Sequence, residues 1–575
     1  MKFPYGISDF RSIILEDYFY CDRTDKIPLL EQAKYQLFIR PRRFGKSLLL
    51  SMLDNYYDIL RKDEFEKLFG GCAIGDKPTS LRNSYFILRF DFSCVDPTGT
   101  VAEVRQSFCS HINNCIIRFK LHYEEFDLVG IDVHEHDALS SMQSLLNVVS
   151  KKEYPVYLLI DEYDNFANAV MMGVRTEEAR YTVLVHEEGS LKTLFKVLKS
   201  ATASSAIDRM FITGVSPVVM SDITSGFNIA ENIYLEAEFN DLCGFLFEEL
   251  ETVVAQIASD CDAGQGKVVE ALGLLKTYYN GYNFSFALPE TPRSPAKIPM
   301  QVYNPTLSLY FLKQFQKTCS FPRNMLDSNL AVDSAKLEFV ANLPKGQKLL
   351  LDLMEKDREV VISEMADRFG IQEMLSDNSR DNAFLASFLY YSGVLTLQGE
   401  TDDLEVVLRV PNLVMKKLYI ERIQPLCDFV EQKYFKVFDN RDYITANELT
   451  VKTAFLTLLY NDLIYLMDSE TENDRRYADL TMIIRPDKRH GAVFDILIEF
   501  KFVSLSAVGL SGVEAKKLFV ADLYQLPDMV EQLENGVKQV KEYGHQLEQK
   551  YSNLRLKKFV VVALGFDRLC FEAVG

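Results

Sequence analysis

The chain carries the stretch FIRPRRFGKS at residues 38–47, in which apolar residues lead into four basic side chains, one glycine and a serine. Outward from it, an apolar run at residues 35–40 precedes the basic turn and a helical pattern at 47–60 follows it. A turn between a strand and a helix directs backbone N–H groups and the helix N-terminus toward one point, which favours an anion. The stretch therefore predicts a phosphate-binding loop in an α/β domain.

Three residues of this loop have an expected role toward a nucleotide. Gly45 allows close backbone approach, Lys46 pairs with the outer phosphates, and Ser47 binds Mg²⁺. The general pattern G-x-x-x-x-G-K-[ST] has glycine where this chain has Arg40, a position that usually needs the backbone freedom of glycine. The alternative is a basic turn without a nucleotide. The residues expected to contact ATP are Arg40, Pro41, Arg42, Arg43, Phe44, Gly45, Lys46, Ser47, Asp161 and Thr213.

A second element with acidic residues is YLLIDE at residues 157–162, an apolar strand pattern that ends in two carboxylates. In nucleotide hydrolases with such a loop, the first acid holds Mg²⁺ and the second polarises the attacking water. Asp161 and Glu162 are assigned these roles, although an ordinary strand end followed by a helix cap would look similar. Thr213 ends another apolar run and is expected to sense the terminal phosphate, because ligands lie at the carboxyl ends of parallel strands.

Near the other end of the chain, Glu499 and Lys501 share one predicted strand at residues 492–500 and its end, after a strand at 477–484 that contains Asp479. Side chains alternate along a strand, so Glu499 and Lys501 point to the same face. Carboxylates on neighbouring strands are hard oxygen ligands for Mg²⁺ or Mn²⁺, and a nearby ammonium stabilises developing negative charge. The pattern predicts a site that cuts phosphodiester bonds. A surface hairpin or an inactive relic of the same fold are the alternatives.

The bulk properties limit the partners. At 575 residues two to four domains are expected. The net charge of −19 repels nucleic acid, so contact with DNA or RNA must depend on the basic patches at residues 40–46 and 485–490. The chain shows no secretion signal and no run long enough to span a bilayer, and its ten cysteines form no C-x-x-C pair, so a cytoplasmic protein without a membrane partner is expected.

Three parts are expected along the chain. Residues 1–235 alternate apolar runs and amphipathic segments, which predicts a parallel sheet with strands at 35–40, 85–92, 156–160 and 209–213. Residues 236–444 are predicted to be mainly helical, with helices at 242–255 and 271–279. Residues 445–575 are predicted to form another α/β unit. Its expected helices lie at 446–463 and 530–549, and its last strand at 558–564.

These motifs resemble two known families. Residues 4–235 are similar to the AAA-ATPase-like family that commonly precedes a C-terminal nuclease-like domain in bacterial proteins. Two later stretches, YNGY at 279–282 and VYNP at 302–305, resemble the middle region of that family. The resemblance implies a P-loop NTPase of the ASCE/AAA-like type, and the family itself has arginine at the position of Arg40. The matching stretches are PYGISDF at 4–10, YCDRT at 20–24, RPRRFGKS at 40–47, LIDEYD at 159–164 and ITGVS at 212–216.

Residues 445–575 resemble the PD-(D/E)xK nuclease superfamily, which implies a restriction-endonuclease-like α/β fold. Tyr477 and Ala478 stand where that family usually has Gly-Arg. The resemblance implies that Asp479, Glu499, Lys501 and Gln539 are catalytic and that Glu470, Asp479 and Glu499 bind metal.

Together the motifs favour an ATP-binding, ATP-hydrolysing module coupled to a nuclease domain that depends on Mg²⁺ or Mn²⁺ and acts on DNA or RNA. The alternative is a nucleotide-controlled binding switch whose nuclease-like domain is catalytically inactive. The cofactors expected are ATP and Mg²⁺.

Overall fold

The structure is a computed structural model that describes the chain in segments. The described residues are 1–96, 100–165, 190–217, 228–286, 301–322, 325, 340, 349, 353, 359–366, 381–401, 403–412, 414, 451, 455, 465–468, 471–473, 476–478, 480–484, 494–551, 554–565 and 567–574.

Contacts within the chain define two compact units. The first comprises Met1–Pro322, Leu326–Leu349 and Glu359–Leu413, and the second comprises Arg323–Met325, Leu350–Arg358 and Val414–Gly575. The first unit thus contains both the expected nucleotide domain and most of the expected helical region. The division at residues 235 and 444 stays a prediction.

A parallel sheet of five strands forms the centre of the first unit. Its order is β2-β3-β4-β1-β5, so β4 lies between the strand that leads into the basic loop and the strand that ends in the two acids. The expected parallel sheet is confirmed, with each predicted strand placed to within two residues, and β5 is an addition. The strands are β1 (Tyr35–Ile39), β2 (Phe86–Asp91), β3 (Val156–Asp161), β4 (Ile207–Gly214) and β5 (Glu231–Asn232).

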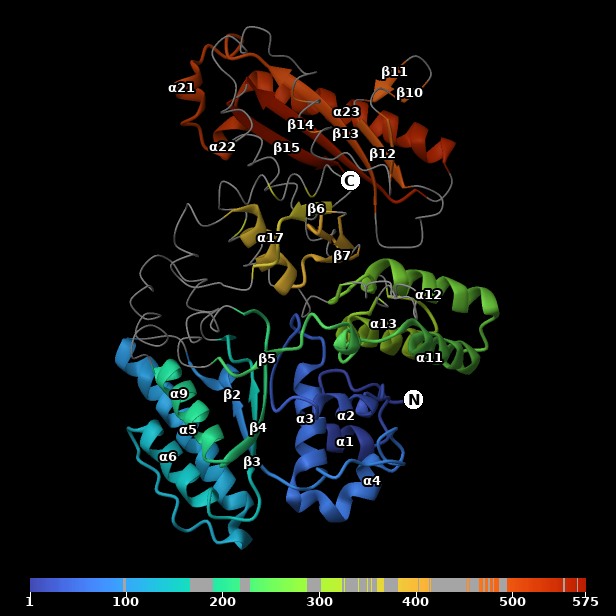
Figure 1. Ribbon diagram of the computed structural model, residues 1–575. Coiled ribbons are helices and arrows are strands. Elements are labelled where there is room, and N and C mark those ends of the chain that lie inside the picture. Colours follow the sequence, from blue (N-terminus) through green and yellow to red (C-terminus); the bar gives the residue numbers. More distant parts are fainter. Residues whose placement is uncertain are drawn as a thin grey trace. The chain divides into compact units, whose positions relative to one another are not determined.

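Helices cover both faces of this sheet (Figure 1). One side carries α5 (Val101–His122), α6 (Ala138–Val149) and α9 (Ser190–Ala203). The other carries α3 (Lys46–Tyr57) and, beside it, α1 (Phe10–Leu15), α2 (Ile27–Leu30) and α4 (Phe65–Phe69). All six residues of β3 are buried, as expected for a central strand covered on both faces.

The rest of the first unit is mainly helical, as predicted, but it also contains a sheet that the sequence analysis missed. Strands β6 (Glu359–Ile362), β7 (Thr396–Glu400) and β8 (Val406–Arg409) pair in the order β6-β8-β7, and both pairings are antiparallel. The helices are α11 (Phe247–Asp260), α12 (Gln265–Tyr279), α13 (Pro305–Thr318) and α17 (Asn382–Tyr391).

A disulfide joins Cys261, at the end of α11, to Cys319, at the end of α13. A cytoplasmic protein, as expected from the sequence, normally keeps its thiols reduced, so this bond differs from that expectation. Seven cysteines of the described chain are free. Separately, none of the helices in the segments given above is both long and apolar enough to cross a membrane.

The second unit contains a mixed sheet of order β15-β14-β13-β12-β9, in which only β13 and β14 run parallel. The predicted strand at 477–484 is two strands, because its halves pair differently: β11 pairs with β10 in a separate ribbon, whereas β12 joins the main sheet. The strands are β9 (Tyr465–Asp468), β10 (Thr471–Asn473), β11 (Arg476–Ala478), β12 (Leu480–Ile484), β13 (Asp495–Val503), β14 (Leu556–Leu564) and β15 (Arg568–Val574). The helices are α21 (Gly512–Ala515), α22 (Val520–Leu523) and α23 (Pro527–Lys550).

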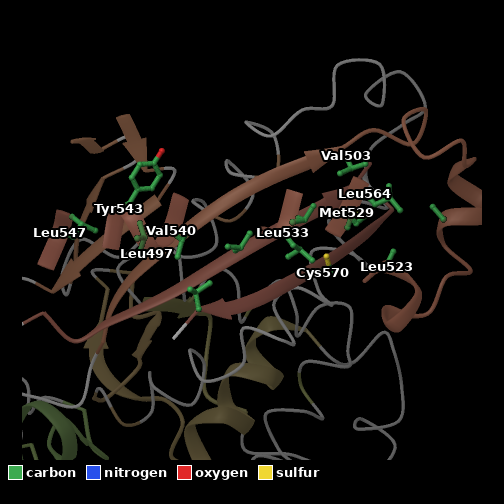
Figure 2. Close-up of a cluster of buried hydrophobic side chains, with 14 residues drawn as sticks. Leu497, Val503, Leu523, Met529, Leu533, Val540, Tyr543, Leu547, Leu564 and Cys570 are labelled. Atoms are coloured by element: carbon green, nitrogen blue, oxygen red, sulfur yellow. The ribbon is translucent and has the colours of Figure 1, made fainter. Parts of the chain in front are cut away.

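Helix α23 packs on one face of this sheet, and Figure 2 shows the apolar cluster between them. The helix contributes Leu533, Val540 and Leu547, while β13 contributes Leu497 and Val503. This packing determines which face of β13 lies beneath the helix.

Candidate nucleotide and nuclease sites

The basic loop joins β1 to α3 through two residues in the left-handed region. Gly45, the N-cap residue of α3, has φ 95°, and Arg43 has φ 68°. A glycine adopts such a backbone without strain, which explains its place directly before the helix. The carbonyl of Arg43 accepts a hydrogen bond from Thr306 Oγ1 at 3.0 Å. The predicted turn between strand and helix is therefore present.

Lys46 is buried at the start of α3, and its ammonium closes the loop from inside. Its Nζ donates to the carbonyl oxygens of Arg40 at 3.0 Å and Pro41 at 3.1 Å. Burial lowers the pKa of Lys46, and the nearby carboxylates of Asp161 and Glu162 oppose that shift. The ammonium thus lies among loop carbonyls and acids rather than in bulk water.

Arg40 points its guanidinium away from the loop. The group donates to the carbonyls of Ile39 and Tyr234 at 2.8 Å each, and to that of Phe239 at 2.8 Å. It also lies over the rings of Phe38 and Phe284, at 4.4 and 4.3 Å from their centroids. Burial lowers the pKa of Arg40 to about 10. Only the backbone of Arg40 therefore belongs to the loop that faces a ligand, and its φ is not left-handed, unlike what the glycine of the general pattern suggests.

The other loop side chains have separate surroundings. Arg42 is exposed and donates to Asn165 Oδ1 at 3.1 Å, which ties the loop to the residues after β3. Phe44 is buried, with its ring edge-to-face against Tyr282 at 4.9 Å. Pro41 is also buried. Sequence reasoning gave these residues one shared role, whereas the structure separates an exposed arginine from two buried anchors.

The two acids that follow β3 meet the start of α3. The hydroxyl of Ser47 lies near the carboxylate of Asp161, and Nη2 of Arg89 lies 3.8 Å from Asp161 Oδ2. Burial raises the pKa of Asp161, against the lowering effects of Ser47 and Lys46. Burial likewise raises the pKa of Glu162, whose φ of 48° is unusual for a residue with a side chain.

The next residues of this stretch, missed by sequence reasoning, fix the end of β4. Asp164 is buried and accepts hydrogen bonds from Val215 N at 3.1 Å and from Ser216 N and Oγ at 2.9 Å each. Tyr163 donates its hydroxyl to Ser216 O at 2.5 Å. Thr213 on β4 is fully buried, and its Oγ1 has no hydrogen-bond partner within the described chain. The signal in the sequence was the full run LIDEYD, whose last two residues were not given a role.

A cavity of about 460 Å³ lies beside the loop. One part is polar, lined by Gly45, Lys46, Ser47 and Glu162. The remainder is lined mainly by residues of four other segments of the first unit, 4–8, 19–23, 242–245 and 305–309. The polar part can hold phosphates and the apolar part a flat ring.

In the second unit, Glu499 and Lys501 lie together on β13. Lys501 Nζ lies 2.8 Å from Glu499 Oε1, and Glu499 is only 3 % exposed. Both residues have the same parity as Leu497 and Val503, which pack beneath α23, so they lie on the face of the sheet that this helix covers. A buried charge pair of this kind needs compensation by partners or a metal.

Helix α23 brings Gln539 to the same face. Gln539 is partly buried, and its Oε1 has no hydrogen-bond partner within the described chain. Glu499 neighbours Val560 in the parallel register, and a Cβ at Gly536 of the helix would lie 2.4 Å from Val560 Cγ1. The helix thus passes close to the strand beside Glu499, one turn before Gln539.

Asp479 and Glu470 lie outside the described residues, as does the basic patch at 485–490. Leu480, which follows Asp479 in the sequence, pairs with Ile498, the residue before Glu499. Asp495, missed by sequence reasoning, is fully buried and accepts from Ile484 N at 2.8 Å and Arg555 N at 2.9 Å, so it joins three strand ends rather than facing a substrate. Among the described residues no group of three or more His, Cys, Asp or Glu side chains is placed to hold a metal.

Comparison with known proteins finds relatives that match only part of the chain or have low structural similarity to it. The chain is 25 % identical over 293 residues to an "Uncharacterized protein in vnfD 5'region" of Azotobacter chroococcum mcd 1, covering 49 % of each protein. It therefore spans about half the length of that curated relative. Among solved structures, Cdc6p of Pyrobaculum aerophilum (10 % identity, 70 % of this chain and 93 % of that one) gives a TM-score of 0.24. ORC1 of Aeropyrum pernix in complex with DNA (11 % identity, 72 % and 96 %) also gives 0.24. At this TM-score neither supports a conclusion.

Family models match both ends of the chain. One model, described as "Predicted AAA-ATPase", matches residues 4–224, and another, described as "PD-(D/E)XK nuclease superfamily", matches residues 446–570. These matches confirm both resemblances inferred from the sequence, and they agree with a parallel-sheet P-loop-like unit followed by a mixed α/β unit. Residues 4–224 are thus similar to the predicted AAA-ATPase family, and residues 446–570 are similar to the PD-(D/E)XK nuclease superfamily.

Proposed function

We propose that the first unit binds ATP with Mg²⁺ and hydrolyses it. The observation that carries this proposal is the convergence of Lys46, Ser47 and Asp161 at the start of α3, where a hydroxyl and a carboxylate lie beside a buried ammonium. Hydroxyl and carboxylate oxygens are the hard ligands that suit Mg²⁺. The residues present therefore fit the expected metal and nucleotide.

Each residue then has a role that follows from its chemistry. Lys46 would exchange its two carbonyl acceptors for phosphate oxygens, which are stronger acceptors because they are charged. Ser47 and Asp161 would hold Mg²⁺, which neutralises phosphate charge when bound. Glu162, with a raised pKa, would orient and polarise the attacking water, and Thr213 would contact the terminal phosphate. The apolar part of the cavity would take the base.

Calorimetry with a non-hydrolysable ATP analogue tests the nucleotide site. We expect Lys46→Ala to weaken binding by roughly a hundredfold or more, because one charge-assisted contact contributes about 1.5–3 kcal/mol and the loop loses its internal cation as well. Lys34→Ala is the control, since Lys34 is exposed on the same unit and pairs with Asp208. Wild-type affinity in Lys46→Ala would refute the proposal for the first unit.

We further propose that the second unit is a metal-dependent nuclease. The supporting observation is the buried Glu499–Lys501 pair on the face beneath α23, with Gln539 on that helix. Asp479, Glu499 and Glu470 would hold Mg²⁺ or Mn²⁺, which would neutralise the scissile phosphate, and Lys501 would stabilise the activated water. ATP binding or turnover would license cleavage.

Cleavage of DNA and RNA with Mg²⁺ or Mn²⁺, measured with and without ATP, tests the second unit. Asp479→Ala and Lys501→Ala should each reduce the rate by about a hundredfold or more, the usual contribution of one charge-stabilising group. Lys517→Ala is the control because that lysine is exposed on the same unit. If both site variants cut as fast as the wild type, the nuclease site is not at β13.

A switch without cutting activity is the second candidate. It is favoured by the net charge of −19, which opposes nucleic acid binding, and by the ion pair that Glu499 already makes with Lys501. It predicts ATP-dependent retention of a nucleic acid or protein without cleavage under any metal condition. Manganese bound at Asp479 and Glu499 together with cleavage would exclude it.

A further inference from the structure

The first unit has a second cavity, of about 530 Å³, that neither proposed activity uses. It lies between β2, the C-terminal part of α3 and α5, on the edge strand of the parallel sheet. The residues Ile87, Arg89 and Asp91 alternate along β2 and all line it, so one face of that edge strand forms its floor. A cavity of this size beside an edge strand can hold a ligand or solvent.

The carboxylates and the guanidinium groups of this cavity differ in the hydrogen-bond partners that the protein gives them. Asp58 accepts hydrogen bonds from Tyr123 Oη at 3.0 Å and Leu60 N at 3.0 Å, and it lies 2.9 Å from His122 Nε2. Asp91 accepts from Ser93 N and Oγ, as the cap of the next helical turn. These two carboxylates therefore already have donors from the protein.

The guanidinium groups are less well matched. Arg118, on α5, is exposed, and its Nη2 lies 3.2 Å from Sγ of Cys115. Arg89 lies 3.8 Å from Asp161, which is beyond hydrogen-bond distance, and its charge also acts on the carboxylate of Asp54. A planar guanidinium presents paired donors that match a carboxylate or a phosphate. Two such groups line the same cavity from different elements.

We propose that this cavity binds a small ligand through an oxyanion, either a phosphate or a carboxylate group, held by Arg89 and Arg118. The carboxylates of Asp54, Asp58 and Asp91 also line the cavity and oppose an anion, and Asp54 has Asp58 as a like-charged neighbour. The apolar side chains of Ile87 and Phe119 also line the cavity and can contact the apolar part of a small organic ligand next to the oxyanion. This cavity is a different one from the cavity beside the basic loop, although Arg89 lies 3.8 Å from Asp161 of the proposed ATP site.

The test uses the full-length Lys46→Ala protein, so that the basic loop contributes no phosphate binding. Titration calorimetry with orthophosphate and, separately, with malonate distinguishes the two sources of the oxyanion. We expect at least one of them to bind at millimolar concentration or better. Adding Arg118→Met should weaken that binding by roughly tenfold or more, as expected for the loss of a paired, charge-assisted contact.

Two further variants sharpen the result. Asp54→Asn should tighten binding a few-fold because it removes one opposing negative charge, whereas Arg105→Met, on the exposed face of helix α5, should change nothing. If Arg118→Met does not fold, Arg118→Lys keeps the charge but not the paired donors and should weaken binding to a smaller extent. The absence of binding to either probe, or equal binding with and without Arg118, would overturn the proposal.

Discussion

Lys46 donates to two carbonyls of its own loop, so a nucleotide would replace existing hydrogen bonds. The exchange favours a phosphate because a charged oxygen accepts more strongly than an amide carbonyl. The ammonium is already in place and buried, so little side-chain freedom remains to be lost on binding. The loop is therefore prepared for an anion by its own backbone.

Glu162 offers a test that separates binding from turnover. It lines the cavity with Lys46, but its proposed role concerns only the attacking water. We expect Glu162→Gln to bind ATP within a few-fold of the wild type and to hydrolyse it about 10²–10⁴ times more slowly, the range for loss of a general base. Calorimetry and phosphate release measure the two quantities, and unchanged turnover would show that another group activates the water.

Residue types alone led us to expect that the lysine, the serine and the two acids lie together, because each has a chemical role that few other side chains can fill; their roles toward a nucleotide stay predictions. They did not predict that Arg40 would turn away from the ligand, since its partners are carbonyls of Tyr234 and Phe239, far along the chain. Asp164 was missed for the same reason: its donors lie in a separate strand end. A motif describes one stretch of sequence, so it does not reveal contacts with distant segments.

Among the elements, α23 carries two glycines that meet different neighbours on β14. A Cβ at Gly536 would lie 2.4 Å from Cγ1 of the buried Val560, whereas one at Gly544 would lie 2.5 Å from Cε of Lys558, a flexible side chain. We expect Gly536→Ala to lower the free energy of unfolding by about 1–3 kcal/mol, because a packed core resists added volume. Gly544→Ala, the matched control, should change it by less than about 1 kcal/mol, since the lysine can move and alanine favours the helix.

Urea unfolding of both variants, followed by circular dichroism, measures this difference. If the two substitutions have equal effects, the helix does not approach the sheet more closely at Gly536. The same contact affects the nuclease site, because Val560 neighbours Glu499 in the sheet.

Periodicity in the sequence predicted the long, regular elements well, among them the strands of the parallel sheet and helix α23. It missed β6, β7 and β8, which are four or five residues long, and β6 pairs with β8 across more than 30 residues of chain. It also joined β11 and β12, because an apolar run does not reveal that its two halves have different partners. Strand pairing depends on two segments, and the pattern of one segment does not identify the strand with which it pairs.

At the scale of the whole molecule, the disulfide between Cys261 and Cys319 closes a loop with a sequence separation of 58 residues. Loop-closure entropy predicts that reduction lowers the free energy of unfolding by roughly 4 kcal/mol. Thermal unfolding of the chain with and without a reductant should show the shift. Cys261→Ser with Cys319→Ser is the companion measurement, and a reductant should have no further effect on it.

An unchanged unfolding temperature after complete reduction would contradict this expectation. The sequence could not predict the bond, because ten cysteines allow many pairings and a cytoplasmic protein was expected to keep them reduced. The pairing depends on how α11 and α13 end, which only the packed helices determine.

Arg40 connects the basic loop to a distant segment of the first unit by hydrogen bonds. Its guanidinium holds the carbonyls of Tyr234 and Phe239, on the stretch of chain that leaves the parallel sheet for the helices beyond, while its backbone carbonyl holds Lys46. A shift of Lys46 toward an incoming phosphate would thus change its hydrogen bond to Arg40, whose guanidinium is bonded to the chain that follows the sheet. An anion that binds Lys46 would therefore act, through Arg40, on the chain segment that follows the parallel sheet.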